Sequence, residues 1–180
     1  GYIFDDDKID LDFYLKESLR YYSNIVASFS KPVINAINKL STIPISVIAP
    51  SHGLIWHKEP ALIAGLYKTW SEYVSGPADK GITLLYGSMY GNTEKYMHRV
   101  VQGIASQGLP VNVFNVSYTN PSYILPSLIL YQGLAIGALT YNGGLFPPMS
   151  SLLEEVGIKR IRSRQSIFFG SYGWGGVALA

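Results

Sequence analysis

The sequence predicts an α/β protein in which a mainly helical segment precedes a doubly wound parallel sheet. Apolar residues recur at helical spacing through most of residues 1–75, whereas short apolar runs alternate with helical segments after residue 80. Between them, the turn formers Ser-Gly-Pro-Ala-Asp-Lys at residues 75–80 interrupt both patterns. We therefore expect one domain to end in residues 1–75, a linker at 76–80 and a sheet domain at 81–180.

The first part contains three expected helices. A stripe of apolar residues at intervals of four and three predicts a helix from about Asp12. The stripe consists of Leu15, Leu19, Tyr22, Val26 and Phe29. A second helix is expected from Ser30 and a third from Pro60, since proline is tolerated in a first turn. The branched apolar run at residues 45–49 predicts a buried strand between them.

The second part contains four expected strands alternating with helices. The strands are predicted at residues 82–86, 111–116, 133–137 and 166–170, and the helices at 93–107, 122–130 and 149–156. Strands and helices that alternate in this way form parallel βαβ units, which assemble into a doubly wound sheet.

Composition excludes several classes of function. The chain has 180 residues, a net charge of +2 and no cysteine, so we expect no nucleic-acid or anionic-membrane partner, no disulfide and no thiolate metal site. No secretory signal pattern is present, and the most apolar stretch, residues 123–139, contains a proline and two glycines that are untypical of a membrane span. These features favour a soluble protein of the cytoplasm.

The loop after the first strand has the composition of a phosphate site. Residues 87–94 read Gly-Ser-Met-Tyr-Gly-Asn-Thr-Glu and lead into a helix, whose unpaired N-terminal amides favour an anion. The same hydroxyls could instead cap the helix, and composition alone does not decide between the two. The lysine of a nucleoside-triphosphate loop and the pattern of a dinucleotide loop are both absent. The loop instead resembles a flavodoxin phosphate loop, and that resemblance implies a phosphate monoester.

Two further loops follow strands of the same sheet. Residues 137–144 and 170–176 combine glycines, which let the backbone approach a ligand, with aromatic residues that could stack on a flat ring. Either loop alone is more typical of an ordinary turn with surface aromatics. Ligands of parallel sheets bind beyond the carboxyl ends of the strands, so the coincidence of all three loops favours a flavin.

The ordered set of motifs resembles flavodiiron proteins, also called A-type flavoproteins. The loop at 87–94 resembles a flavodoxin phosphate loop. Gly-Ala-Leu-Thr-Tyr-Asn at 137–142, with Phe-Pro-Pro at 146–148, and Ser-Tyr-Gly-Trp at 171–174 resemble the flavin-contacting loops of that family. Ala-Pro-Ser-His-Gly-Leu-Ile-Trp at 49–56 resembles the segment that closes the family's metallo-β-lactamase-like domain, and the region around residues 21–25 is also similar.

The resemblance implies a function for these residues. Flavodiiron proteins reduce oxygen to water or nitric oxide to nitrous oxide at a diiron site, receive electrons through FMN from rubredoxin or an NAD(P)H-linked reductase, and act as head-to-tail homodimers. His52 matches an iron ligand. The implied FMN-binding residues are Ser88, Met89, Tyr90, Gly91, Asn92, Thr93, Ala138, Leu139, Thr140, Tyr141, Asn142, Gly143, Ser171, Tyr172, Gly173, Trp174 and Gly175. No residue of the chain is assigned a catalytic role.

The chain also departs from the family. It lacks the His-x-Glu-x-Asp-His cluster, so His52 cannot hold two irons alone, and four strands are expected where a flavodoxin-like sheet has five. We therefore expect a fragment that lacks the last strand and helix. The acidic run at residues 5–7 is interpreted as leading into the first helix, and His57 and Glu59 as surface residues. A stand-alone flavodoxin-like electron carrier and an FMN-dependent quinone reductase remain alternatives.

Overall fold

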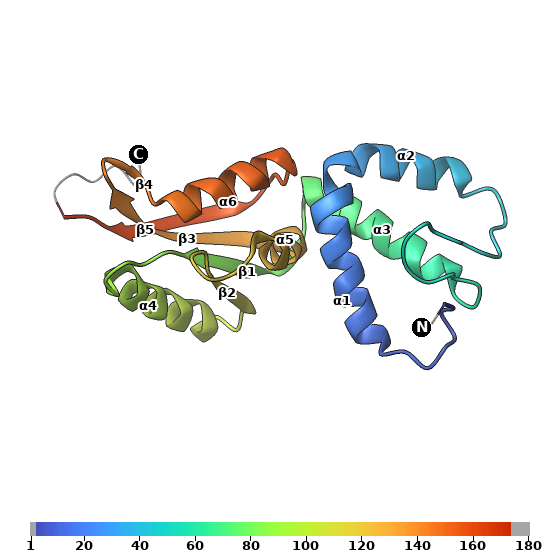
Figure 1. The fold of residues 1–180 in the computed structure, drawn as a ribbon, viewed down its shortest axis with the longest axis horizontal. Helices are drawn as coiled ribbons and strands as arrows, with labels where there is room; N and C mark the ends of the chain where they lie inside the picture. Colours follow the sequence, from blue (N-terminus) through green and yellow to red (C-terminus); the bar gives the residue numbers. More distant parts are fainter. Residues whose placement is uncertain (1–2, 174–180) are drawn as a thin grey trace.

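The protein consists of a helical part and a sheet part that lie end to end in an elongated molecule (Figure 1). The computed structural model describes residues 3–173. The N-terminal helices form one end of the molecule, and the sheet with its helices forms the other (Figure 1). None of the helices within the described residues is long and apolar enough to cross a membrane.

The helical part contains the three expected helices. Its elements are α1 (Leu11–Tyr21), the π-helical turn η1 (Tyr22–Val26), the 3₁₀ turn η2 (Ala27–Phe29), α2 (Ser30–Leu40) and α3 (Pro60–Ser75). Asp10 caps α1 by accepting a hydrogen bond from the Phe13 backbone N–H at 3.0 Å. The stripe predicted across α1, η1 and η2 is buried at Leu19 and Tyr22, but Phe29 is exposed because the π and 3₁₀ turns rotate it away from the core.

The buried strand predicted at residues 45–49 is wrong. The segment is extended and mostly exposed, and its single ladder contact is an antiparallel bridge between Ile48 and Trp56. A strand becomes buried only where neighbouring strands and a covering layer take up its backbone groups and side chains. Among the described residues this run has one bridging partner, so Ile45 and Val47 stay exposed.

The sheet part has the predicted doubly wound topology. Its strands are β1 (Asp79–Tyr86), β2 (Val111–Asn115), β3 (Tyr131–Tyr141), β4 (Gly144–Leu145) and β5 (Gln165–Ser171). Its helices are α4 (Asn92–Ser106), α5 (Pro121–Leu130) and α6 (Pro147–Ile158). The four long strands are parallel in the order β2-β1-β3-β5, and β4 pairs antiparallel with β3.

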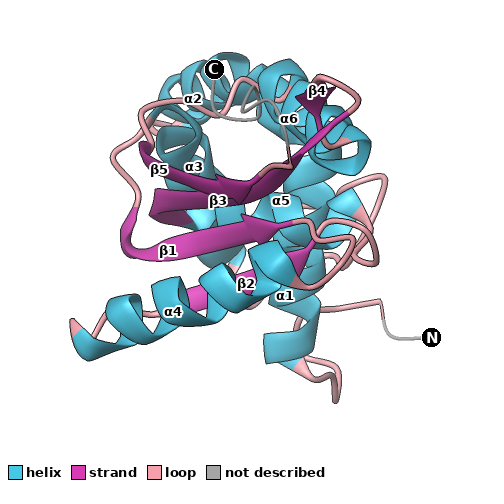
Figure 2. Cartoon of the chain, turned by 90° about the vertical axis from the view of Figure 1, so that its left-hand side faces the viewer, coloured by secondary structure: helices cyan, strands magenta, loops and turns pink. Residues whose placement is uncertain are grey.

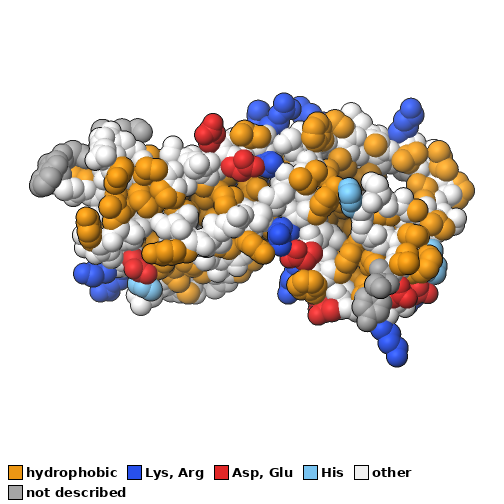
Figure 3. Space-filling model, in the orientation of Figure 1, with side chains coloured by type: hydrophobic (Ala, Val, Ile, Leu, Met, Phe, Trp, Pro, Cys, Tyr) orange, Lys and Arg blue, Asp and Glu red, His pale blue; other side chains and the backbone are white. Residues whose placement is uncertain are grey.

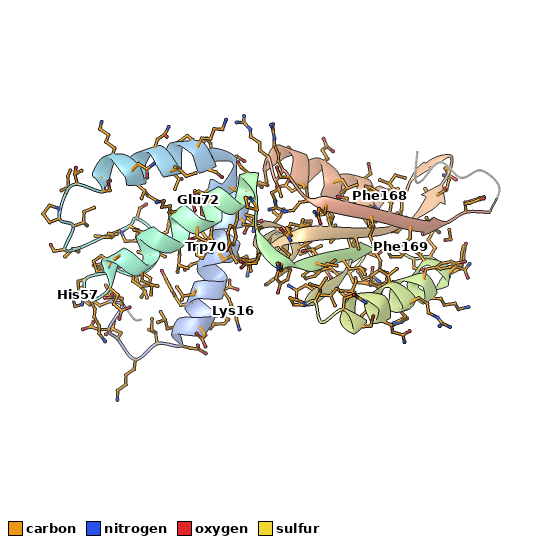
Figure 4. The ribbon with its side chains drawn as sticks, turned by 180° about the vertical axis from the view of Figure 1, so that it is seen from behind. Lys16, His57, Trp70, Glu72, Phe168 and Phe169 are labelled. Carbon is orange, nitrogen blue, oxygen red and sulfur yellow. The ribbon has the colours of Figure 1, made fainter. Side chains whose placement is uncertain are left out.

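Helices cover both faces of this sheet (Figure 2). Leu85 on β1 packs with Ile124 of α5 and Met149 of α6, whereas its neighbour Leu84 packs with Met97 of α4 on the opposite face. Successive residues of a strand point to opposite faces, so β1 is apolar on both sides, as expected for a central parallel strand. On β5, the consecutive Phe168 and Phe169 behave differently, because Phe169 packs on the α4 side while Phe168 is 59% exposed (Figure 4).

Strand bounds differ most from the sequence expectation at the start of β1 and the end of β3. β1 begins at Asp79, inside the segment predicted as a linker, and β3 runs to Tyr141 where an end at Gly137 was expected. Strand pairing rather than residue preference causes both extensions. Asp79 pairs with Tyr131, and the residues after Gly137 pair with β5 as far as Leu139. The short strand β4 was not predicted.

Candidate functional site

The three candidate loops meet at one edge of the sheet. They follow β1, β3 and β5, and we call residues 87–91, 140–144 and 171–173 the first, second and third edge loops. In the sheet, β2 lies on one side of β1 and β3 lies on the other. The direction in which strands are added therefore reverses between β1 and β3. The first and second edge loops therefore flank the crevice where parallel sheets of this order bind ligands.

The first edge loop presents unsatisfied polar groups. The hydroxyl of Ser88 is buried and, among the described residues, it is the one buried side-chain N or O atom without a hydrogen-bond partner. Gly91 precedes α4 with a φ of 78°, and no side chain caps that helix. The first-turn amides of α4 therefore keep their affinity for an anion. The side chains of Met89 and Tyr90 are exposed.

Hydrogen bonds connect the first edge loop and the helix after it to the neighbouring strands. The Gly87 N–H donates to the Gly137 carbonyl at 2.9 Å, which continues the β1–β3 pairing beyond the end of β1. The Thr93 and Ser171 hydroxyls lie 3.0 Å apart and link the first turn of α4 to the end of β5. Thr93 is buried, so this hydroxyl faces the sheet edge and not the solvent. These bonds tie the first edge loop to β3, and the first turn of α4 to the end of β5.

The second edge loop is a tight hairpin. Asn142 and Gly143 both have positive φ values, 47° and 77°, and connect the pairs Thr140–Leu145 and Tyr141–Gly144. Positive φ at both central positions is typical of a type I′ turn, which Asn-Gly favours. Of the residues predicted here to contact flavin, the turn residues and Tyr141 are exposed, while Leu139 and Thr140 are half-buried.

Ala138 is a different case, because its side chain is 1% exposed and belongs to the core that contains Met149 and Phe146. Its methyl group therefore faces the helices under the sheet edge. A contact of Ala138 with a ligand would have to come from its backbone.

The third edge loop brings an aromatic side chain to the same edge. Ser171 ends β5, and Tyr172 and Gly173 are exposed after it. Trp174 and Gly175, which the sequence also suggests as ring contacts, lie outside the described residues. Tyr141 and Tyr172 therefore extend from the ends of two neighbouring strands, β3 and β5.

The ring of Phe146 lies against Gly87 and explains why the first edge loop begins with a glycine. A Cβ atom on Gly87 would overlap the ring of Phe146, which lies just before α6. Phe146 is part of the Phe-Pro-Pro segment that the sequence grouped with the second loop. The structure shows that this residue supports the first loop from below.

The sheet edge fits a phosphate monoester attached to a flat ring. Buried or half-buried hydroxyls at Ser88 and Thr93 and the uncapped amides of α4 suit the phosphate. No lysine or arginine occurs in residues 87–94, so an anion in this loop would be bound by neutral hydrogen-bond donors. Two features of the site could not be found from the sequence, because both depend on how separate segments pack. They are the Thr93–Ser171 contact and the unpaired hydroxyl of Ser88.

His52 lies far from this edge, in the helical part. It lines a cavity of about 700 Å³ whose wall is mainly apolar and also contains Tyr14, Tyr21 and Tyr67. The loop that carries His52 is closed by the Ile48–Trp56 bridge and held by a hydrogen bond from the Leu54 N–H to the Tyr14 hydroxyl at 2.9 Å.

The described residues contain no group of three or more potential metal ligands that includes His52. The structure therefore assembles no metal site around it within residues 3–173. Hydrophobic side chains are frequent on the visible surface of this part (Figure 3).

The acidic run at residues 5–7 does not lead directly into α1. The Asp5 carboxylate is almost completely buried and accepts backbone N–H bonds from His57, Lys58 and Glu59 at 2.8–3.2 Å. Burial pushes the pKa of Asp5 upward, but these three donors outweigh it and leave the pKa lowered. Asp5 therefore fixes the backbone of residues 57–59, just before α3. His57, labelled in Figure 4, adds a contact of 3.0 Å to Asp6 at the surface.

Comparison with known proteins identifies the sheet part. A profile of the flavodoxin family matches residues 84–178. The chain belongs to the flavodoxin family. This flavodoxin-family chain is also 30% identical over 175 residues to a nitric oxide reductase of Moorella thermoacetica, and 35% identical over 178 residues to an anaerobic nitric oxide reductase flavorubredoxin of Aliivibrio salmonicida.

These similarities extend through both parts of the flavodoxin-family chain. The alignments cover 96% and 97% of it, but 43% and 35% of the two relatives, so it spans less than half the length of either. A flavo di-iron protein of Thermotoga maritima superimposes with a TM-score of 0.88 at 25% identity, covering 100% of this chain and 45% of that one. Rubredoxin:oxygen oxidoreductase from Desulfovibrio gigas shares the fold, with a TM-score of 0.90 at 23% identity over 98% of this chain and 44% of that one.

Proposed function

We propose that the chain is the FMN-binding electron-transfer portion of a flavodiiron oxidoreductase that reduces oxygen to water, nitric oxide to nitrous oxide, or both. Residues 1–75 would then be the end of a metallo-β-lactamase-like domain and residues 81–180 the flavodoxin-like domain. The names of its relatives, nitric oxide reductase and flavorubredoxin, support this assignment.

The observation that carries the proposal is the unpaired Ser88 hydroxyl at the strand-order reversal. A buried hydroxyl without a partner is unfavourable unless a ligand completes it. In this proposal Ser88, Thr93 and the first amides of α4 hold the phosphate of FMN. FMN, when bound, supplies a group that accepts and releases electrons.

The chain's own residues would position the flavin and limit its access to water. Tyr141 and Tyr172 stand at the ends of β3 and β5 and would flank the ring. The Asn142–Gly143 turn has exposed backbone amides that can approach the ring edge without a Cβ barrier at Gly143. Fixed donors of this kind tune the electron affinity of a bound cofactor.

The position of His52 relative to the first edge loop bears on the homodimer that the resemblance implies. His52 lines its cavity in the helical part together with Tyr21 and Tyr67, and the first edge loop follows the end of β1, at the far end of the sheet part (Figure 1). The whole of β1, about 26 Å long, lies between them. A flavin and an iron on one chain would therefore be far apart. This separation favours a head-to-tail homodimer in which each flavin passes electrons to the partner subunit's iron.

Binding of two flavins tests the proposal. Titration of the flavin-free protein, followed by flavin fluorescence, should give tighter binding of FMN than of riboflavin by at least about tenfold, because a hydrogen bond to a charged group contributes about 1.5–3 kcal/mol. Equal affinity for the two flavins would show that the first edge loop is an ordinary turn.

A second experiment tests the iron assignment in the whole protein. His52→Asn should lower iron content and the reduction of oxygen or nitric oxide with a rubredoxin or NAD(P)H-linked donor, while FMN binding stays unchanged. His98→Asn, at an exposed position of α4, is the matched control. Unchanged iron content in His52→Asn would contradict the assignment.

A further inference from the structure

A half-buried arginine stands at the junction between the helical part and the sheet part. Arg164 lies just before β5, and its guanidinium donates to carbonyl oxygens of three different segments. The accepting carbonyls are those of Tyr73 at 2.8 Å, Leu128 at 2.9 Å and Ile129 at 3.2 Å. The fourth acceptor is the carbonyl of Arg162. Among the described residues no carboxylate forms an ion pair with Arg164.

The accepting carbonyls belong to helix ends. Tyr73 lies in the last turn of α3, from the helical part, and Leu128 and Ile129 lie in the last turn of α5, from the sheet part. The last carbonyls of a helix lack intrahelical donors and carry the negative end of its dipole. A single cation therefore neutralises two helix C-termini that meet from opposite sides of the junction. Burial lowers the pKa of Arg164 to about 10, which still leaves it charged at neutral pH.

The backbone around Arg164 is shaped for this contact. Arg160 and Ser163 both have positive φ values, 59° and 56°, which are uncommon for residues other than glycine. Gly76, at the end of α3, approaches the same turn so closely that a Cβ atom there would lie 2.9 Å from the Ser163 Cβ. The Arg162 N–H also donates to the Val74 carbonyl at 2.9 Å. Strained backbone persists where its surroundings hold it.

Other contacts also cross the junction between the two parts. Trp70 and Val74 of α3 pack against Ile129 of α5, with Trp70 pointing towards the junction in Figure 4. Apolar packing of this kind stabilises the junction but does not set its orientation, because the hydrophobic effect is non-directional. Hydrogen bonds run from the Asn24 amide to the Ser122 carbonyl at 3.2 Å, from the Ser28 hydroxyl to the Ile158 carbonyl at 3.2 Å and from the Lys159 ammonium to the Asn24 carbonyl at 2.5 Å. The Arg20 guanidinium also lies 4.2 Å from the centre of the Tyr123 ring. Each of these contacts joins one pair of residues, whereas the planar guanidinium of Arg164 bonds the ends of α3 and α5 at once.

We propose that Arg164 is a positioning residue that fixes the orientation of the helical part relative to the sheet part by joining the C-terminal ends of α3 and α5. Arg164 also begins the segment that becomes β5, whose last residue, Ser171, bonds the first turn of α4 at the sheet edge. The arginine thus aligns the part that carries His52 with the strand that ends at the edge loops. This inference goes beyond the proposed function, since it requires neither flavin nor iron.

The distance between two spin labels tests the inference. The printed sequence has no cysteine, so Asn35→Cys on α2 and Gln102→Cys on α4 provide single exposed labelling positions in the two parts. Arg164→Met keeps an unbranched side chain and removes the donors. We expect it to broaden the distance distribution by about twofold or more, because the variant loses the bonds that join the ends of α3 and α5, and domains without such a connection move relative to each other. Arg162→Met, with an exposed side chain two residues away, should leave the distribution narrow.

Hydrogen exchange of the same variants separates positioning from general stability. In Arg164→Met we expect faster exchange at the Arg162 N–H and unchanged protection of the amides that pair β1 with β3. Arg164→Lys should give an intermediate distribution, since one ammonium group cannot span three segments. A narrow distribution in Arg164→Met, or a broadening equal to that of Arg162→Met, would overturn the inference. Loss of β1–β3 protection in both Arg164→Met and Arg164→Lys would also overturn it, by showing a role in folding alone.

Discussion

The hydroxyl of Thr93, in the first turn of α4, lies 3.0 Å from the hydroxyl of Ser171, the last residue of β5. The two residues are 78 positions apart in the sequence. Their contact places a hydroxyl pair where the start of α4 meets the third edge loop, beside the uncapped amides of α4. The two hydroxyls have different expected roles, because Thr93 belongs to the proposed phosphate site and Ser171 positions the third loop.

Substitution of the two residues should separate these roles. Thr93→Val removes the hydroxyl at nearly constant volume and should weaken FMN binding by about 10- to 100-fold with little change for riboflavin, because a bond to a charged phosphate is lost. Ser171→Ala should weaken both flavins to a similar, smaller extent. Titrations followed by flavin fluorescence measure both. Thr42→Val, at an exposed position of the helical part, serves as the control. Equal losses of FMN and riboflavin in Thr93→Val would remove Thr93 from the phosphate site.

Ser88→Ala should have opposite effects on stability and on binding. The buried, unpaired hydroxyl destabilises the flavin-free protein, so its removal should leave the free energy of unfolding unchanged or raise it by about 1 kcal/mol. The same change should weaken FMN binding by about tenfold or more. Urea unfolding without flavin and an FMN titration measure the two quantities. A clear loss of stability without flavin would mean that the hydroxyl has a partner within the fold.

Gly87→Ala should destabilise the sheet edge. The added methyl group overlaps the Phe146 ring, and overpacking of this kind costs about 1–3 kcal/mol. Phe146→Leu in the same chain should recover part of the loss by making room. Gly103→Ala is the matched control, since nothing lies within 4 Å of its Cβ and the position is inside α4, where alanine is favoured by about 0.5–1 kcal/mol. Thermal or urea unfolding of the four proteins measures these differences.

Stability should fall with rising pH between pH 10 and pH 12 because of Tyr67. Burial, followed by the neighbouring Tyr21, Tyr14 and Tyr22, raises the pKa of Tyr67 from 10 to about 12. Above pH 10 the unfolded chain loses this phenolic proton while the folded protein keeps it, so the folded state binds more protons and the free energy of unfolding decreases with pH. Tyr67→Phe should flatten this part of the profile, whereas Tyr118→Phe, at an 88% exposed position, should not. Urea unfolding across this range measures the slope.

Local sequence patterns predicted most elements of the fold. Helices were expected from Pro60 and Thr93, and α3 and α4 begin at Pro60 and Asn92. The strand predicted at residues 45–49 is wrong, although its composition is more apolar than that of β1. Composition reports the tendency of a segment to be buried, but pairing with neighbours decides whether a strand forms. The extension of β3 to Tyr141 has the same origin, since it depends on β4 and β5.

The candidate site was predicted in its parts and not in its connections. Sequence identified the hydroxyl-rich turn and the two aromatic loops, and the topology brings all three to one edge. The buried position of Ala138 and the support of Gly87 by Phe146 required the structure. The roles proposed for individual residues in FMN or iron binding stay predictions for the experiments above.

The sequence by itself determined the class of each segment and the chemistry available in the loops, because helical periodicity, turn formers and hydroxyl content are local properties. Only the tertiary structure decided which of these groups meet. The Thr93–Ser171 contact, the unpaired Ser88 hydroxyl and the Arg164 junction all join residues from separate elements. Such contacts depend on how whole helices and strands pack, and packing is a property of the assembled chain that no local pattern records.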